Sequence, residues 1–464
     1  MRLMTILTLA LPVLTASSLS AAPISVGFAE VDVSPEIGKK PVLMAGFGMN
    51  RVATKIHDPI MARAIVLSDG KVKLAMVCVD VVGLFNPSVQ RVRDQLKGFD
   101  HILVSSTHNH EAPDTLGLWG KSPFQSGVDA DYLKKIEDGA AKAVQLAETA
   151  RRPADAKLGT AKGPELLHDA RLPEVKHDEL VAILFESATP EKPAGILVQW
   201  NCHPETLDSK NTEVSADYVA STVRYLKETY KCPVVYFTGT VGGLMTSLHV
   251  DVKNDAGVSL KDGTFEKTEK YGLLVGKLAE KALANAKPVD LAPFEIRSQE
   301  FLVPVDNGLY RLAYQAGVLQ RTMYLWEGTA TPKKFIPEKD ITKPIAVKSE
   351  IAYLKLGELD IASIPGEIYP ELVLSKVQTP VDPAADFPDA AVEPGIYAQM
   401  TAKHHMLIGL ANDELGYFLP KRQWDEKPPY CYGLKKQQYG EVNSVGPEAG
   451  PIICGVFKAL AKPR

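Results

Sequence analysis

The sequence predicts an α/β protein built from mixed β-sheets flanked by helices. Two observations support this fold class: apolar runs of strand length recur along the chain, and amphipathic helical segments lie between several of them. The predicted strands cover residues 62–67, 74–82, 102–105, 180–185, 195–200, 234–237, 351–356, 361–364 and 406–410. This mixture predicts one or two largely apolar sheets covered by helices.

The helical segments show one apolar face each. Residues 129–149 place apolar side chains at spacings of three and four, which is the pattern of an amphipathic helix. Comparable segments cover residues 215–230, 269–286 and 453–460. In contrast, residues 329–349 are rich in Lys and Pro and have no stable periodicity, so we expect an exposed linker or lid there.

The N-terminal residues 1–22 have the layout of a signal peptide, with one early arginine, an apolar stretch and small residues before Pro23. The apolar stretch is too short to span a bilayer as a helix, and no later stretch approaches the required length. We therefore expect a secreted or periplasmic protein without a transmembrane segment. Residues 23–464 are expected to form a single domain.

Composition narrows the range of functions. A formal net charge of −4 with 23% charged residues provides no basic surface, which disfavours nucleic-acid binding. None of the five cysteines has the close paired spacing of a thiolate zinc site. Cys431 and Cys454 could pair in an oxidising compartment, and the sequence does not decide whether they do. The oligomeric state is not predicted either.

Metal-ligand side chains follow three of the predicted strands. His108 and His110 come after the strand at 102–105, His203 comes after the strand at 195–200, and Glu367 comes after the strand at 361–364. Ligands of open α/β sheets bind outside the carboxyl ends of the strands, and imidazole and carboxylate groups are zinc ligands. The sequence therefore predicts a metal site at the C-terminal ends of strands, with His108, His203 and Glu367 as ligands.

The sequence offers two candidates for a fourth metal ligand. The strand at 406–410 leads into a segment that contains Glu414 and Tyr417, and either side chain would lie at a comparable strand end. Each motif also has a purely structural interpretation. The histidines could cap loops, and Glu367 could interact with the N-terminal dipole of the helix that follows it.

Taken together, these motifs resemble the neutral/alkaline ceramidase family of zinc amidohydrolases over residues 24–450. The resemblance rests on short motifs in the same order: residues 26–35, Ala62-Arg63-Ala64, Thr107-His108-Asn109-His110, Asn201-Cys202-His203-Pro204, Pro365-Gly366-Glu367 and Tyr417. It implies that His108, His203, Glu367 and Tyr417 bind Zn²⁺. It also implies that His110 faces the substrate and that Arg171 is the active-site arginine, although Arg171 could instead pair with a carboxylate such as Glu174.

The chain also departs from the family pattern. Family members carry a Gly-Asp-Val-Ser-Pro-like segment with an active-site serine, and here Met245 occupies the serine's place. Glu111 stands where the family usually has serine after the second histidine. We also expect the family's C-terminal immunoglobulin-like domain to be absent. The resemblance therefore implies a divergent member that lacks the active-site serine.

The function that follows is zinc-dependent hydrolysis of an amide (N-acyl) or ester bond by metal-activated water, a route that needs no serine. His110 and Arg171 would be the catalytic residues, through proton transfer and oxyanion stabilisation. The substrate would be a small molecule or a lipid, and the family implies sphingolipid metabolism. Two alternatives stay open, a non-catalytic secreted binding protein and a metal-dependent phosphoesterase or sulfatase. The Asp-rich ligand sets that usually hold paired metals are not seen.

Overall fold

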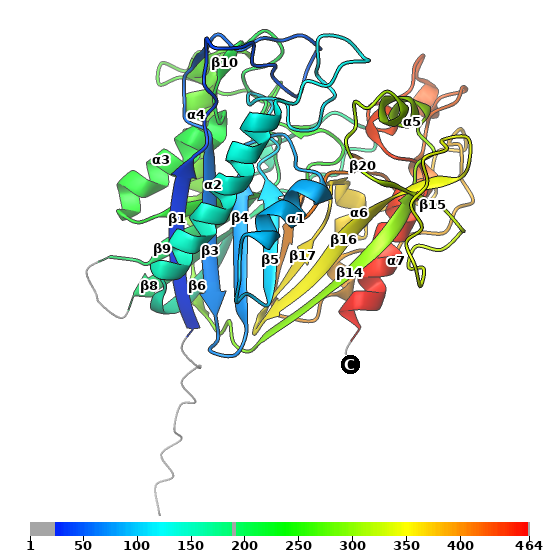
Figure 1. The fold of residues 1–464 in the computed structure, drawn as a ribbon. Coiled ribbons are helices and arrows are strands. Elements are labelled where there is room, and N and C mark those ends of the chain that lie inside the picture. The colour runs from blue at the N-terminus through cyan, green and yellow to red at the C-terminus, as the bar shows by residue number, and fades with distance from the viewer. Residues whose placement is uncertain (1–23, 188–191, 463–464) are drawn as a thin grey trace, which may run out of the picture.

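The computed structural model of the 464-residue chain describes residues 24–187 and 192–462, and these residues form two β-sheets packed face to face (Figure 1). The signal peptide predicted at residues 1–22 lies outside the described residues. Across residues 24–187 and 192–462, no helix has the length and apolar character needed to cross a membrane.

The first sheet has nine strands in the order β11-β9-β8-β6-β1-β3-β4-β5, with β13 paired to β6. The β4–β5 and β9–β11 pairs are parallel, and the other pairs are antiparallel, so the predicted mixed sheet is confirmed. The strands are β1 (Ile24–Asp32), β3 (Met61–Ser68), β4 (Lys73–Val79), β5 (His101–Ser106), β6 (Arg152–Lys162), β8 (Glu179–Ser187), β9 (Gly195–Trp200), β11 (Val234–Thr238) and β13 (Lys287–Val289).

The second sheet has the order β14-β16-β17-β19, with β15 paired to β16. Its strands are β14 (Phe294–Pro304), β15 (Met323–Leu325), β16 (Ile345–Leu356), β17 (Leu359–Ser363) and β19 (His404–Ile408). Three short pairs complete the strands: β2 (Lys55–Ile56) with β10 (Glu213–Val214), β7 (His168–Asp169) with β12 (Met245–Thr246), and β18 (Glu367–Ile368) with β20 (Tyr417–Phe418).

Helices cover the outer faces of both sheets. The helices of the described residues are α1 (Asn86–Asp94), α2 (Ala130–Thr149), α3 (Tyr218–Tyr230), α4 (Phe265–Ala284), α5 (Gly308–Gln315), α6 (Pro370–Leu374) and α7 (Ala449–Ala461). Short 3₁₀ turns lie at Pro164–Leu166, Tyr397–Gln399, Lys421–Gln423, Cys431–Gly433 and Glu441–Asn443. Helix α2 packs on β1, β3 and β4, α4 packs on β6 and β8, and α7 packs on β14 and β16 (Figure 1).

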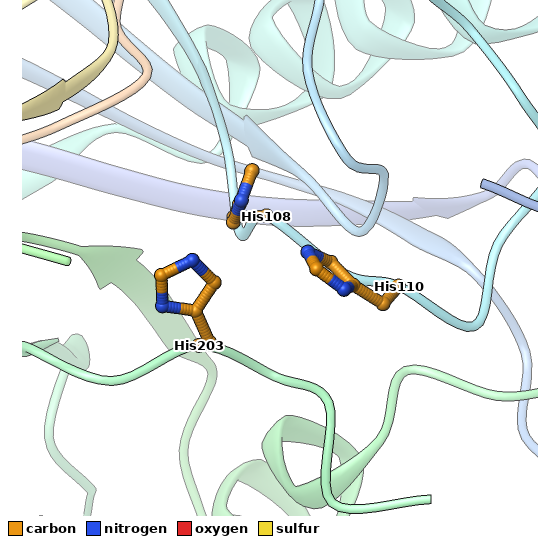
Figure 2. A group of neighbouring side chains, drawn as sticks. All are labelled: His108, His110 and His203. Atoms are coloured by element: carbon orange, nitrogen blue, oxygen red, sulfur yellow. The ribbon is translucent and has the colours of Figure 1, made fainter. Parts of the chain in front are cut away.

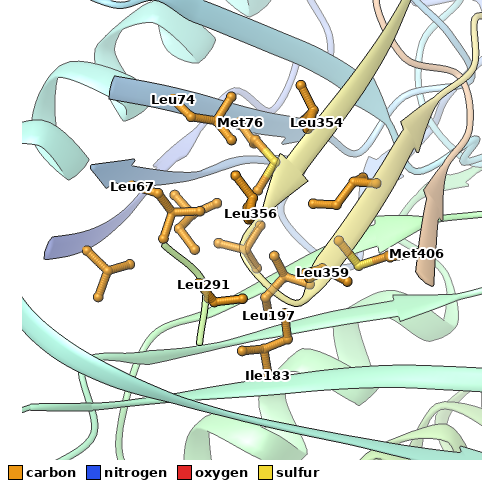
Figure 3. Close-up of a cluster of buried hydrophobic side chains, with 14 of the residues drawn as sticks. Leu67, Leu74, Met76, Ile183, Leu197, Leu291, Leu354, Leu356, Leu359 and Met406 are labelled. Carbon is orange, nitrogen blue, oxygen red and sulfur yellow. The ribbon is translucent and has the colours of Figure 1, made fainter. Parts of the chain in front are cut away.

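The main core lies between the two sheets (Figure 3). Leu67, Leu74 and Met76 of the first sheet meet Leu354 and Leu359 of the second. Alternate residues of the same strands point the other way and pack under the helices, because successive side chains of a strand face opposite sides. The result is a four-layer arrangement of helices, sheet, sheet and helix.

The prediction of an exposed linker over 329–349 was wrong at its end, since residues 345–349 are the first part of β16 and mostly buried. All five cysteines are buried free thiols, so Cys431 and Cys454 do not pair with each other.

Candidate metal centre and pocket

His108 and His203 are each oriented by a backbone carbonyl. The Nδ1 of His108 lies 2.7 Å from the carbonyl oxygen of Val82, and the Nδ1 of His203 lies 2.9 Å from that of Met245. A carbonyl oxygen only accepts hydrogen bonds, so each Nδ1 carries the proton and each Nε2 is left with its lone pair. This arrangement is typical of histidines that bind zinc.

The two free Nε2 atoms face the carboxylate of Glu367. Glu367 Oε2 lies 3.3 Å from Nε2 of His108 and 3.0 Å from Nε2 of His203. Tyr417 pairs with Glu367 in the β18–β20 register, and its Oη lies 3.3 Å from Nε2 of His203. Four buried ligand-type side chains therefore meet at one point.

Of the two side chains that could supply a fourth ligand, Tyr417 contacts His203 of the cluster. The carboxyl group of Glu414 forms its hydrogen bond outside the cluster: its Oε1 accepts from the backbone N–H of Gly416 at 2.7 Å. Burial and the carboxylate of Glu367 raise the pKa of Glu414 well above its usual range. Glu414 nevertheless lines the same pocket as the histidines.

His110 is the third histidine of this cluster (Figure 2). Ligand atoms of His108, His110 and His203 lie within 4.8 Å of one another, so the three imidazoles could also hold a metal ion. The Nδ1 of His110 lies 3.3 Å from Oε2 of Glu205, a buried residue that the sequence reasoning missed. Burial holds the pKa of His110 well below its usual range.

His108 occupies an uncommon backbone conformation, with a φ of 66° in the left-handed region. Non-glycine residues adopt this region at a free-energy cost, and such residues cluster at functional sites where the surroundings impose them. The carbonyl of Thr107, next to it, accepts a hydrogen bond from Oγ1 of Thr238 at 2.7 Å. Hydrogen bonds with the carbonyl of Val82 and with the hydroxyl of Thr238 in β11 thus hold the turn that follows β5.

The segment that follows β19 brings the two histidine turns together. In the first sheet β5 and β9 are separated by β8, β6, β1, β3 and β4. The N–H of Gly409 donates to the carbonyl of Thr238 in β11, while the N–H of Asn412 donates to the carbonyl of Val104 in β5. Residues 409–412 therefore bridge the ends of β11 and β5, and His203 follows β9, the neighbour of β11.

Arg171 lies in a buried ion pair behind the pocket. Its guanidinium contacts both carboxylate oxygens of Glu441 at 2.7 Å and donates to the carbonyls of Gln423 and Tyr439. Its carboxylate partner is thus Glu441 rather than Glu174. Tyr439 lines the pocket and Arg171 does not, so Arg171 lies beneath the pocket wall. A catalytic role for Arg171 stays a prediction.

Met245 has its side chain in the core beneath α3 and α4. Its backbone carbonyl is the group that orients His203. The neighbouring hydroxyl groups are also buried, and Oγ of Ser247 lies 2.6 Å from Oγ1 of Thr206.

A pocket of about 410 Å³ opens onto the cluster and is lined in part by His108, His110, Glu367 and Tyr417. The rest of its wall is largely apolar: Phe47, Val82, Phe85, Leu116, Leu118, Trp119, Val305, Leu319, Met323, Val347, Leu415 and Val445. No local sequence pattern marks this wall, because its residues come from loops and strands scattered between positions 46 and 445. Such a lining suits a substrate with an apolar chain.

Comparisons with known proteins support the same fold. Neither protein-family models nor curated protein sequences match the chain. Among solved structures, a neutral ceramidase from Pseudomonas aeruginosa superposes with a TM-score of 0.70 at 15% identity, covering 95% of this chain and 74% of that one. A structure described as ceramidase complexed with C2 gives 0.69 at 14% identity, covering 95% and 75%. The chain therefore has a ceramidase-like fold over nearly its whole length.

Proposed function

We propose that this protein is a secreted or periplasmic zinc-dependent hydrolase that cleaves an amide (N-acyl) or ester bond in a small-molecule or lipid substrate. The observation that carries the proposal is the pair of imidazoles fixed by the carbonyls of Val82 and Met245, with both Nε2 atoms facing Glu367. The likeness in fold to solved ceramidases supports a hydrolase scaffold.

We assign His108, His203, Glu367 and Tyr417 as the zinc ligands. Two neutral imidazoles, a carboxylate and a phenol match the nitrogen and oxygen donors that zinc takes in catalytic sites. We leave His110 outside this set because Glu205, rather than a backbone carbonyl, lies beside its Nδ1. Zinc bound here would act as a Lewis acid and lower the pKa of water towards neutrality.

The remaining residues would handle the substrate. His110 lines the pocket, so it can take a proton during the reaction and return it to the leaving group, with the carboxylate of Glu205 beside its Nδ1. The apolar wall would bind an acyl or alkyl chain and exclude water. This route uses no side chain at position 245.

The test is metal analysis of the purified protein, with hydrolysis of N-acyl and ester substrates measured in parallel. We expect one zinc per chain in the wild type, and loss of both zinc and turnover in His108→Ala and in His203→Ala. His249→Ala is the matched control, because the side chain of His249 is 73% exposed and lies outside the cluster.

Two outcomes would contradict the proposal. A wild-type protein without bound metal would remove its basis. Zinc without turnover on any amide or ester substrate would favour a binding protein on a hydrolase scaffold.

A further inference from the structure

Glu414 places an unpartnered carboxyl oxygen in the wall of the pocket. Only 5% of the residue is exposed, and its Oε2 has no hydrogen-bond partner among the described residues. The other oxygen, Oε1, accepts one hydrogen bond from the N–H of Gly416. Leaving a buried acceptor unsatisfied costs about 1–3 kcal/mol, so such a group in a ligand pocket needs an explanation.

The nearby cation does not supply the missing partner. The guanidinium of Arg321 also lines the pocket, but it pairs with both oxygens of Asp413, at 3.1 and 2.7 Å. It also donates to the backbone carbonyl of Lys348. Towards Glu414 it makes only a 3.5 Å contact, and that contact is with the backbone oxygen.

The neighbouring backbone leaves room for the Glu414 side chain. A Cβ atom added to Gly83 would lie 2.9 Å from Cγ of Glu414 and 3.3 Å from Leu116. The glycine thus allows the carboxyl stem to lie against the main chain next to Val82, whose carbonyl orients His108. The backbone therefore accommodates the Glu414 side chain in the wall of the pocket that also contains His108 and Glu367.

We propose that Glu414 is a specificity-determining residue whose Oε2 forms a hydrogen bond with a hydroxyl group of the substrate, next to the scissile bond. The ligand class is a mainly apolar molecule that carries one hydroxyl group, on either the acyl or the amine side. This inference rests on the proposed hydrolase function. A site that hydrogen-bonds a substrate group rejects analogues without that group, because its buried acceptor is then left unpaired.

The experiment uses two matched substrate pairs. N-octanoyl ethanolamine and N-octanoyl propylamine differ by a donor on the amine side, and 2-hydroxyoctanoyl and octanoyl amides differ by a donor on the acyl side. For one of the pairs we expect the zinc-loaded wild type to favour the hydroxyl substrate about tenfold in kcat/KM. Glu414→Leu is expected to reduce that ratio to about one, and Glu414→Gln to keep part of it.

Controls separate this role from a structural one. Leu319→Ala removes apolar contact from the same wall and is expected to lower turnover of both members of a pair equally. All variants are expected to keep one zinc. Loss of zinc in Glu414→Leu would overturn the inference, because Glu414 would then be a metal ligand. Equal ratios in wild type and Glu414→Leu for both pairs would overturn it as well.

Failure of the hydrolase proposal gives a different result. If the zinc-loaded wild type hydrolyses none of these substrates, the hydrolase proposal is wrong. Calorimetric binding of the same four compounds then decides the role of Glu414. Equal affinities of wild type and Glu414→Leu for both hydroxyl compounds would overturn the hydrogen bond, and a loss confined to one of them would support it.

Discussion

His203 is held twice by the carbonyl oxygen of Met245: its backbone N–H donates across 2.8 Å and its ring Nδ1–H donates across 2.9 Å. Both contacts are with the main chain. The carbonyl would therefore orient the imidazole whatever side chain stands at position 245. The side chain itself is fully buried in the core under α3 and α4.

The first prediction concerns Met245. Met245→Leu conserves side-chain volume, so we expect a loss of less than about 1.5 kcal/mol in unfolding free energy and unchanged zinc content. Met245→Ala leaves a cavity and is expected to cost about 2–5 kcal/mol, again with zinc retained. Urea unfolding and metal analysis measure both effects. A fully stable Met245→Leu protein without turnover would show that this side chain takes part in catalysis.

The second prediction concerns Glu205, whose Oε2 lies 3.3 Å from Nδ1 of His110. Glu205→Gln removes the negative charge beside the imidazole, which would stabilise the ring when it takes up a proton. We expect kcat to fall about 10²-fold, the lower range for a positioned acid or base, with zinc content unchanged. Glu213→Gln is the matched control, since Glu213 lies 3.5 Å from His57 outside the pocket. Equal activity of the two variants would remove Glu205 from the mechanism.

The third prediction concerns the buried pair of Arg171 and Glu441. Arg171→Met leaves the Glu441 carboxylate buried without its partner, so we expect a loss of about 3–5 kcal/mol in unfolding free energy. Arg171→Met combined with Glu441→Gln removes both charges and is expected to recover part of that loss. Denaturant unfolding gives the stabilities. If the double variant is stable but inactive, Arg171 also serves catalysis, and if turnover returns with stability, its role is structural.

The fourth prediction concerns pH and Glu371. Burial raises the pKa of this carboxyl to about 7, and the nearby Asp169 adds to the effect. The folded state therefore binds more protons than the unfolded state between the ordinary carboxyl pKa and about pH 7. Stability contributed by this group should fall as pH rises through that window and level off above it. Glu371→Gln is expected to flatten the curve, measured by urea unfolding at pH 5 and pH 8. An unchanged slope would contradict this.

Much of the fold could be predicted because the signals are local. Central strands such as β4 and β9 are nearly all apolar, and Asp129 caps α2 by accepting from two backbone N–H groups. Strands β6 and β14 were missed. Their sequences interleave lysine, arginine, glutamate and glycine with the apolar residues, so no continuous hydrophobic run marks them.

Within the candidate site, local sequence patterns predicted only some of the residues that meet there. His108, His203 and Glu367 each follow a recognisable apolar strand, which is why the sequence pointed to them. Glu205 follows no strand end of its own, and its only signal is a position two residues after His203. Glu414 was noticed as a possible ligand, but its unpartnered oxygen depends on Gly83 and Arg321, which are distant in sequence.

Which strands end in ligand-type side chains can be read from short segments, because strand periodicity and the residues at strand ends are local properties. That these strand ends meet follows only from the three-dimensional arrangement of the chain. Strands β5 and β9 are far apart in their sheet, and backbone hydrogen bonds from residues 409–412 bridge β5 to β11, the neighbour of β9. Such bonds join main-chain groups that every residue carries, so no sequence pattern marks them.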